Sequence, residues 1–520
     1  MADIPDPVLS QLSEFVAAQM GLRFPRERWH DLERGLRSAA DEFGFVDAEA
    51  CCQWLLSSPL TRSQIETLAG HLTVGETYFF REKRSFEILE EHVLPELIRA
   101  RRGAEPRLRL WSAGCCSGEE PYSIAILLSR LIPDWQDWHI TILATDINPH
   151  FLRKASAGVY GEWSFRDTPA WIRDRYFKRT SASRFEITPS IRKRVTFSYL
   201  NLAEDTYPSL LNNTNAMDVI FCRNVLMYFA PERARKVVQN LNRSLVEGGW
   251  LIVSPSEASH ALFTPLVTIN FPDAILYRKD SHSLRVADDF TPRGMPVDTT
   301  PEAPQGSFSC DTARAEHGTV QLPVDFSIQS SPEAAVPLPT QESRTPGAEE
   351  PLPAQPPYHE TFVLFEQGRY AEVEERMMAL LSQNPNDARA MAFLTRLYAN
   401  QGKLSEALAW CERAVAADRL NPSSHYLHAT IQREQGQVEE AVKSLKRALY
   451  LDPDFVLAHY ALGNLALQQG QFEEADKHFE NALLLLSAYP RDDLLPESDG
   501  LTAGRLLEII RATVYQETLT

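Results

Sequence analysis

The chain has 520 residues, too many for a single hydrophobic core, so two to four domains are expected. Hydrophobic residues make up 44% of the sequence, yet no stretch reaches the roughly 18 uninterrupted apolar residues of a membrane-spanning helix. The net charge of −18 argues against a nucleic-acid-binding protein, which would usually be basic.

The charge is unevenly distributed along the chain. Residues 1–280 carry 33 Lys and Arg against 35 Asp and Glu, so the remainder of the chain carries a net charge of −16. Within the first part, residues 151–200 hold eleven basic and four acidic residues. We therefore expect a locally basic surface in the first half of the chain and an acidic second half.

The seven cysteines indicate a reducing compartment. Their odd number and crowded pairs do not suit a disulfide framework, and none lies in a CxxC or a His/Cys spacing that binds zinc. The first residues also lack the basic and apolar regions of a signal peptide. We expect a cytoplasmic protein that holds no metal and inserts into no membrane.

The first hundred residues are expected to be helical, because they show long periodic segments without strand alternation. A basic stripe lies near their start, with spacings of 3, 4, 4 and 3 that put its members on one face if the segment is a helix. The stripe consists of Arg23, Arg26, His30, Arg34 and Arg37. It is either a recognition surface for an acidic partner or an ordinary solvated face.

An α/β domain is expected next. Short apolar runs ending in turn-forming residues alternate with helical patterns, which predicts a mostly parallel, doubly wound sheet. The four runs are "PRLRLWSAG", "HITILATDI", "AMDVIFCRN" and "GGWLIVSPS". Ligands of such sheets bind beyond the carboxyl ends of the strands, where the unusual residues of this sequence stand.

The stretch "AGCCSGEEP" at 113–121 follows the first of these strands and precedes a helix that should begin near Glu119. Gly114 and Gly118 would allow a tight turn and a close approach to a ligand, and the helix N-terminus favours an anion. Asp146, at the tip of the second strand, could accept hydrogen bonds from two ribose hydroxyls. On spacing alone, an ordinary turn and a helix cap remain equally acceptable interpretations.

Residues 281–357 are predicted to be a disordered linker, because prolines recur there among Ser, Thr and Glu.

A repeat follows the linker. It is marked by four glycines spaced by 34 residues, Gly368, Gly402, Gly436 and Gly470. Alanines recur at fixed distances after the last three of them. These are Ala407, Ala441, Ala475, Ala414, Ala448 and Ala482. The pattern resembles tetratricopeptide repeats and predicts a helical solenoid over 358–489, followed by a capping helix and tail at 490–520.

Five motifs, in this order, resemble the CheR family of chemoreceptor glutamate methyltransferases over roughly residues 10–280. They are "LTVGETYFFRE" (72–82), "WSAGCCSGEEPYSIA" (111–125), "ATDI" (144–147), "YLNL" (199–202) and "DVIFCRNVLMYF" (218–229). The resemblance implies an all-α N-terminal domain over 1–90 and a Rossmann-like S-adenosylmethionine-binding domain over 91–280. A small antiparallel β-subdomain is implied at about 156–200. Attached tetratricopeptide repeats are a known variant, including the Wsp-type surface-sensing methyltransferases, which this arrangement looks most like.

The resemblance also assigns roles to residues. Thr77 and Arg81 are implied to reach the cofactor from the N-terminal domain, and Tyr228 to face the methyl-transfer centre, with Arg81 and Tyr228 as the catalytic candidates. The basic helix is implied to contact the receptor through Arg23, Arg26, Arg34 and Arg37. The other implied cofactor-binding residues are Gly75, Gly114, Glu119 (with Glu120 beside it), Asp146, Asn201, Leu202, Arg223 and Asn224. Many family members have Asn at the position of Gly75, which puts one side-chain contact to the cofactor in doubt.

The expected reaction is methyl transfer from S-adenosylmethionine to glutamate side chains of the cytoplasmic helical region of a methyl-accepting receptor, leaving S-adenosylhomocysteine. Recruitment to membrane receptor arrays would follow from binding this substrate. The turn in "KRTSASRFEI" (178–187) lacks the glycine-containing insertion that some members use to dock a receptor pentapeptide, so pentapeptide-independent recognition is predicted. Two alternatives are a catalytically weak adaptor acting through its repeats and a methyltransferase of small carboxylic acids. The repeats are expected to bind a further protein.

Overall fold

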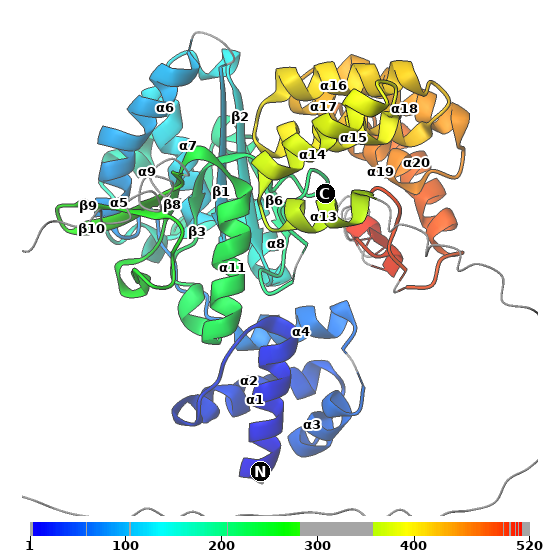
Figure 1. Cartoon of the computed structure of the whole chain (residues 1–520). Helices are drawn as coiled ribbons and strands as arrows, with labels where there is room; N and C mark the ends of the chain where they lie inside the picture. The colour runs from blue at the N-terminus through cyan, green and yellow to red at the C-terminus, as the bar shows by residue number, and fades with distance from the viewer. Residues whose placement is uncertain are drawn as a thin grey trace, which may run out of the picture.

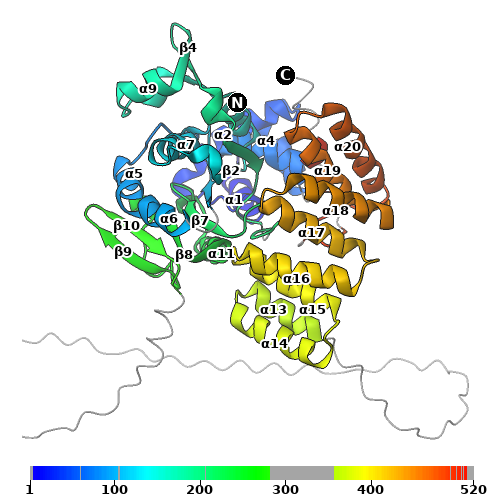
Figure 2. The same cartoon turned by 90° about the horizontal axis from the view of Figure 1, so that it is seen from above.

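The structure is a computed structural model. It describes residues 4–58, 60–102, 106–204, 206–280, 357–491, 493–498, 501–504, 506–507 and 509–511. The predicted linker at 281–357 lies outside these residues apart from Pro357, and so does much of the predicted tail. A helical N-terminal domain, an α/β domain and a helical repeat domain are arranged as shown in Figures 1 and 2.

The N-terminal domain is all helical, as predicted. Its elements are α1 (Asp6–Met20), η1 (Arg26–Arg28), α2 (Trp29–Glu42), α3 (Ala48–Leu56) and α4 (Arg62–Leu72). Side chains set two of the helix starts: the Asp47 carboxylate accepts the first N–H groups of α3, and Thr61 forms a capping box with Gln64 at α4. Leu12, Val16 and Leu32, all fully buried, belong to the core between these helices.

A second helical segment connects this domain to the sheet. It comprises α5 (Lys83–Ile88), the π-helical turn η2 (Leu89–Val93) and α6 (Leu94–Arg101). Its apolar side chains, together with Phe79 and Phe80, pack in the core of the α/β domain and not with α1–α4. The domain boundary predicted at residue 90 therefore falls inside this segment, and packing places the change of domain before Phe79.

The α/β domain contains a seven-stranded mixed sheet in the order β6-β2-β1-β7-β8-β10-β9. The strands are β1 (Arg107–Ala113), β2 (His139–Asp146), β6 (Val195–Tyr199), β7 (Met217–Phe221), β8 (Leu245–Ile252), β9 (Val267–Phe271) and β10 (Ala274–Arg278). β6, β2, β1, β7 and β8 are parallel, and β10 and β9 add an antiparallel edge. The direction of winding changes between β1 and β7, which is where ligands of doubly wound sheets bind.

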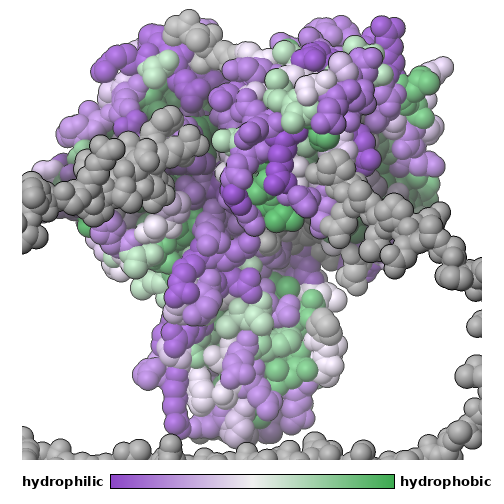
Figure 3. Space-filling model, viewed as in Figure 1, coloured by the Kyte–Doolittle hydropathy of each residue, from purple (hydrophilic) through white to green (hydrophobic). Residues whose placement is uncertain are grey.

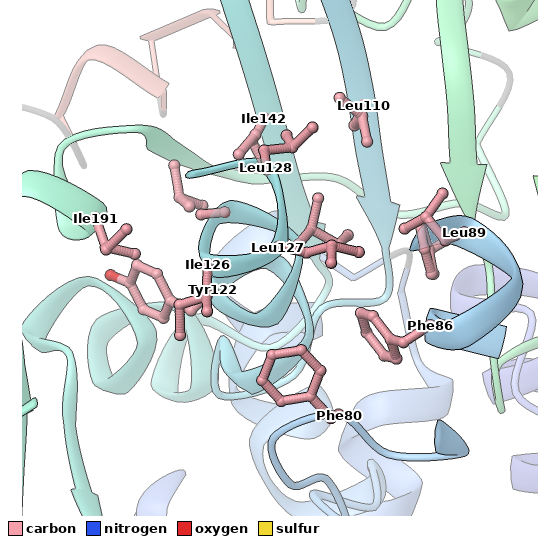
Figure 4. Packing of buried hydrophobic residues seen from close by; sticks show 14 of the residues in the cluster. Phe80, Phe86, Leu89, Leu110, Tyr122, Ile126, Leu127, Leu128, Ile142 and Ile191 are labelled. Atoms are coloured by element: carbon pink, nitrogen blue, oxygen red, sulfur yellow. The ribbon is translucent and has the colours of Figure 1, made fainter. Parts of the chain in front are cut away.

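Helices cover both faces of this sheet, as the buried strands require. The connecting helices are α7 (Glu119–Leu131), η3 (Trp135–Asp137), α8 (Pro149–Ala157), η5 (Leu226–Tyr228), α11 (Pro231–Ser244) and η6 (Pro255–Glu257). Alternate side chains of β1 enter different cores: Leu110 packs with α5–α7 and Trp111 with α11. In Figure 4, the Leu127 side chain of α7 lies between Leu110 of β1 and Phe86 of α5.

A small antiparallel sheet of order β3-β5-β4 follows α8, as the family resemblance implied. Its elements are β3 (Val159–Gly161), η4 (Glu162–Phe165), α9 (Ala170–Tyr176), β4 (Phe177–Ser181), β5 (Arg184–Ile187) and α10 (Pro189–Arg192). The rings of Phe79, Phe165 and Phe177 pack within 5.0 Å of one another, centroid to centroid, and attach this β-subdomain to the main core.

The C-terminal domain is a solenoid of paired helices. These are α13 (Pro357–Glu366), α14 (Tyr370–Gln383), α15 (Ala388–Asn400), α16 (Leu404–Ala417), α17 (Pro422–Glu434), α18 (Val438–Leu451), α19 (Val456–Gln468) and α20 (Phe472–Leu486). The four periodic glycines lie in the tight turns between paired helices with φ between 74° and 77°, a left-handed conformation that favours glycine. The periodic alanines are fully buried where the helices cross.

The repeat domain packs against the α/β domain. Leu210, in the loop before β7, joins a core formed by Ala407, Cys411 and Ile431 of the repeats. Figure 3 shows a mostly hydrophilic surface with scattered hydrophobic patches. In the part of the chain that the structure describes, every helix is too short or too polar to cross a bilayer.

Candidate active site

The loop after β1 forms one wall of a pocket at the carboxyl edge of the sheet. Gly114 and Gly118 have φ of 86° and 93°, and Cys116 is also left-handed at 48°. A Cβ atom on Gly114 would lie 2.4 Å from Cγ2 of Val225, so only glycine fits there. α7 begins at Glu119, as predicted, and its first N–H groups lie beside this loop.

The two cysteines of this loop serve as packing residues. Cys115 is buried, and burial raises the pKa of both thiols, to about 12 for Cys116. Both thiols are therefore neutral at physiological pH, which does not suit a redox or metal-binding role. The Cys116 backbone N–H instead donates a 2.8 Å hydrogen bond to the Asp146 carboxylate.

Asp146 ends β2 at the floor of the pocket. Its second oxygen accepts the N–H of Asn148 at 2.9 Å, so both oxygens are fixed by backbone donors. Burial raises the pKa of this carboxyl to about 6, and the backbone N–H donors oppose that rise. A carboxylate held in this way can still accept hydrogen bonds from ligand hydroxyls through its remaining lone pairs.

The structure gives the adjacent carboxylates different surroundings. Glu119, the residue predicted to bind cofactor, is 1% exposed and accepts hydroxyl hydrogen bonds from Ser117 at 2.7 Å and Ser164 at 3.0 Å. It does not line the pocket, whereas Glu120 does. The assignment to Glu119 is therefore corrected to Glu120. Successive residues of a helix point about 100° apart, so only one of the two can face the ligand.

Glu120 is part of a buried ion-pair network with the loop after β7. Its carboxylate accepts the Ser112 hydroxyl at 2.7 Å and lies 3.0 Å from a guanidinium nitrogen of Arg223. Arg223 also lies 3.0 Å from Glu82, so one guanidinium is shared by two carboxylates. Burial raises the pKa of Glu120, and the Arg223 charge opposes the rise. This arrangement leaves net negative charge beside the pocket, suited to a cationic group.

The loop after β7 contributes Asn224 and Tyr228, both of which line the pocket. Asn224 is left-handed with φ of 57°. The Tyr228 ring lies under the guanidinium of Arg28, whose carbon is 5.5 Å from the ring centroid. The Tyr228 carbonyl accepts the N–H of Arg23 at 2.7 Å, so the N-terminal domain fixes this side of the pocket.

The segment between α4 and α5 forms the opposite wall. Thr77 and Arg81 line the pocket, and the Arg81 guanidinium donates to the Glu76 carbonyl. Gly75 does not line it; a Cβ atom there would lie 2.7 Å from Cζ of Phe151, so the Asn of other family members would not fit without movement. Phe80 and Glu82 of this segment are left-handed non-glycine residues, and such residues concentrate around functional sites.

Asn201 and Leu202, after β6, form the far end of the pocket. The Asn201 side chain is 1% exposed, donates to the Gln19 carbonyl at 3.1 Å and accepts the Ala203 N–H at 3.0 Å. The Asn201 amide therefore connects α1 to the loop after β6 and fixes the backbone of that loop. Leu202 gives this end of the pocket an apolar surface.

Of the four arginines predicted to contact substrate, only Arg23 lines the pocket. Arg26 pairs with Asp6 at 2.8 Å, and the other two pair with acidic residues of their own helix, Arg34 with Asp31 and Arg37 with Glu33. The helical spacing argument is wrong for the first two arginines, because α2 begins only at Trp29. Pro25 and a β-bridge from Leu22 to Phe229 set the conformation before it.

Together these segments enclose a pocket of about 1090 Å³, measured out to its open mouth. Its charged and polar lining residues are Arg23, Arg28, Thr73, Glu76, Thr77, Arg81, Glu120, Asp146, Asn201, Arg223, Asn224 and Tyr228. Sequence reasoning did not single out Arg28 and Glu76, and it named Glu120 only as the neighbour of Glu119. The only sequence feature that could have pointed to Arg28 is its position directly before α2. Its spacing from the other basic residues does not distinguish it from them.

Comparison with known proteins agrees with this architecture. The family described as CheR methyltransferase, SAM binding domain matches residues 75–266, and tetratricopeptide families match 364–431, 429–470 and 456–488. A probable chemotaxis protein methyltransferase of Rhizobium etli is 38% identical over 207 residues, covering 39% of this chain and 75% of that protein. Chemotaxis protein methyltransferase 1 of Pseudomonas aeruginosa is 37% identical, covering 41% and 77%.

A third relative, from Pseudomonas aeruginosa, is described as the probable biofilm formation methyltransferase WspC. It is 31% identical over 256 residues, covering 49% of this chain and 58% of that protein. The fold, the pocket and these matches lead to one conclusion. The chain belongs to the CheR family of S-adenosylmethionine-dependent chemotaxis protein methyltransferases and carries tetratricopeptide repeats on the C-terminal side of its catalytic domain.

Proposed function

We propose that this protein methylates glutamate side chains in the cytoplasmic helical region of a methyl-accepting chemotaxis-type receptor, forming glutamate methyl esters that tune signalling. The observation that carries the proposal is the composition of the pocket. Carboxylates line the pocket, and so do three arginines that precede the sheet in sequence, Arg23, Arg28 and Arg81. A cationic cofactor and an anionic substrate can therefore be held in one site.

The residues present fit S-adenosylmethionine. Asp146 offers acceptor oxygens for ribose hydroxyls, Glu120 offers negative charge for an ammonium group, and Leu202 offers an apolar surface for a base. Glycine at position 114 keeps the loop free of a Cβ atom that would collide with Val225. When bound, the cofactor supplies an activated methyl group on a sulfonium. The chain itself then has to position the acceptor.

The reaction needs no strong general base, because a glutamate side chain is ionised at neutral pH. Catalysis is therefore assigned to orientation of the acceptor and exclusion of water. Arg81 is the main candidate for orienting the substrate carboxylate, and the Tyr228 hydroxyl is the second. The Arg81 guanidinium donates to a backbone carbonyl, and no carboxylate among the described residues lies within ion-pair distance of it, so it can accept an anionic substrate.

Incubation with labelled S-adenosylmethionine and receptor cytoplasmic fragments tests the proposal. Transfer of label into the receptor as a base-labile ester is expected, and replacing the acceptor glutamates with alanine should abolish it. Cofactor binding without transfer to any receptor fragment would favour a catalytically weak adaptor instead. Transfer only to small carboxylic acids would contradict the macromolecular substrate.

We further propose that substrate recognition does not require a receptor C-terminal pentapeptide. Support comes from the β-subdomain, where β4 and β5 pair up to Ser181 and Arg184. Only residues 182 and 183 separate these strands, and neither is a glycine. Calorimetric titration with a receptor tail peptide should show no binding at micromolar concentrations; a micromolar dissociation constant would contradict the proposal.

A further inference from the structure

Glu257 is a buried carboxylate next to the pocket that does not line it. Glu257 is the last residue of the 3-10 turn η6, which follows β8, and it is 7% exposed. β8 lies beside β7 in parallel register, with Phe221 opposite Ile252, so the loops that follow both strands meet at the carboxyl edge of the sheet. A buried charge needs compensating partners, and these identify what the side chain does.

Among the residues that the structure describes, the hydrogen-bond partners of the Glu257 carboxylate are backbone N–H groups. One oxygen accepts the N–H of Val225 at 2.7 Å and that of Met227 at 3.2 Å. The other accepts the N–H of Asn224 at 2.7 Å and that of Ser254 at 3.3 Å. Three of these four donors belong to the loop after β7, so one anion from a neighbouring strand organises that loop.

The loop held in this way carries two residues of the pocket. Asn224 adopts a left-handed conformation, which is unfavourable for a non-glycine residue and has to be stabilised by its surroundings. Tyr228 follows one turn later and lies against Arg28. Without the anion, three backbone donors would lose their partner, and the loop would have to find another conformation to satisfy them.

We propose that Glu257 is a positioning residue for methyl transfer. Its carboxylate fixes the backbone of residues 224–227 and thereby places Asn224 against the cofactor and Tyr228 against the substrate. It acts through the loop and touches neither reactant. The inference rests on the proposed role of the pocket, because it assigns Asn224 and Tyr228 to the two ligands.

The test uses the full chain with Glu257→Gln and Glu257→Ala. Glu232→Gln is the control, because Glu232 lies in the first turn of α11, the helix after the β7 loop, and its side chain is 78% exposed. Calorimetric titration with S-adenosylhomocysteine gives the stoichiometry and the dissociation constant, and methyl transfer to a receptor fragment gives kcat and KM. Glutamine keeps one acceptor oxygen but presents an amide N–H₂ to the other donors, so it should be intermediate.

We expect one bound S-adenosylhomocysteine per chain in every variant, with the dissociation constant raised and kcat lowered about tenfold each in Glu257→Ala. Glu257→Gln should lie between this variant and the wild type, and the control should match the wild type. Unchanged Kd and kcat would overturn the inference. So would reduced stoichiometry with a normal Kd in the remaining sites, since that pattern means partial unfolding.

If Glu257→Ala does not fold, the same comparison is made with Glu257→Gln alone. Failure of the inference can be distinguished from failure of the proposed function. If the wild type itself does not bind S-adenosylhomocysteine or transfers no methyl group, the proposed function is wrong. If the wild type does both and the Glu257 variants match it, only the positioning role is wrong.

Discussion

If Asp146 binds the cofactor as proposed, cofactor binding should be sensitive to mildly acidic pH. Burial raises its pKa to about 6, and hydroxyl donors from a ribose would stabilise the ionised form. The affinity for S-adenosylhomocysteine should therefore be constant above pH 7 and fall as the pH drops below 6. The limit is about tenfold per pH unit if only the carboxylate form binds. Calorimetry from pH 5 to 8 measures this, and Asp146→Asn should bind weakly with a flat profile.

The same shift affects the stability of the empty protein. A carboxyl whose pKa is higher in the folded state than its ordinary value of 3.8 binds its proton more tightly when folded. Its contribution to stability is therefore present at low pH and is lost as the pH rises through about 6. Without ligand, the unfolding temperature of the wild type should therefore fall more, or rise less, between pH 5 and pH 7.5 than that of Asp146→Asn, whose amide does not titrate. The same pH dependence in both proteins would contradict a raised pKa at this position.

Arg81→Ala should reduce turnover far more than cofactor affinity. The guanidinium lines the pocket and is anchored on a backbone carbonyl, which suits it to orient an anionic acceptor. Loss of one such orienting donor typically costs about a hundredfold in kcat. The control is Arg84→Ala, because Arg84 pairs with Glu87 and does not line the pocket. A normal kcat, or a rise in Kd that matches the loss of kcat, would remove Arg81 from its catalytic role.

The loop between β1 and α7 requires glycine at position 114 for two separable reasons. Its φ is 86°, and a Cβ atom would also collide with Val225. Gly44 provides the comparison, since its φ is 81° and nothing lies within 4 Å of an added Cβ atom. Gly44→Ala should lower the free energy of unfolding by about 1 kcal/mol, because only the left-handed backbone conformation is unfavourable for alanine there.

Gly114→Ala should cost more than this and should also weaken S-adenosylhomocysteine binding, because the collision displaces the loop that carries Asn224. Denaturant titration and calorimetry of both variants measure the difference. Equal losses of stability with normal binding in both would mean that the loop relaxes without affecting the pocket.

At the scale of elements, regular periods in the sequence are the reliable signals. The apolar runs predicted β1 and β2, and the 34-residue spacing predicted the repeats, since each repeat needs a left-handed turn after its first helix. The basic stripe was misleading because Pro25 and the Leu22–Phe229 bridge hold Arg23 outside any helix. Glu119 and Glu120 are equivalent in sequence, and only the direction in which α7 leaves the sheet distinguishes them.

At the scale of the whole molecule, the repeats contact the sheet at the edge opposite the pocket. The turn at Gly402 lies beside Arg107 and Val246, and the turn at Gly436 beside His139. Arg107, His139 and Val246 lie at the amino ends of β1, β2 and β8. No sequence period could have revealed this contact, because it joins residues more than 150 positions apart. These turns of the repeat domain therefore contact the amino edge of the sheet, whereas the pocket lies at its carboxyl edge.

A buried ion pair links the two domains. Arg109 of β1 and Glu434 of α17 lie 2.5 Å apart with side chains 2% and 5% exposed. Arg109 also donates to the carbonyls of Asn213 and Asn215, so its guanidinium connects the sheet, the loop before β7 and the repeats. Both charges are almost completely buried, so removing Glu434 would leave the Arg109 guanidinium buried without its ion-pair partner.

Glu434→Ala should therefore destabilise the protein by about 3 kcal/mol, measured by denaturant unfolding. Glu440→Ala is the matched control: Glu440 lies 2.7 Å from Lys443, but both side chains are more than half exposed, so this substitution should cost far less stability. Because the Arg109–Glu434 pair lies at the amino edge of the sheet, S-adenosylhomocysteine binding by folded Glu434→Ala should match the wild type. Equal stability of the two variants would show that the domains are not joined through this pair. A weakened Kd in folded Glu434→Ala would show instead that the repeats communicate with the pocket.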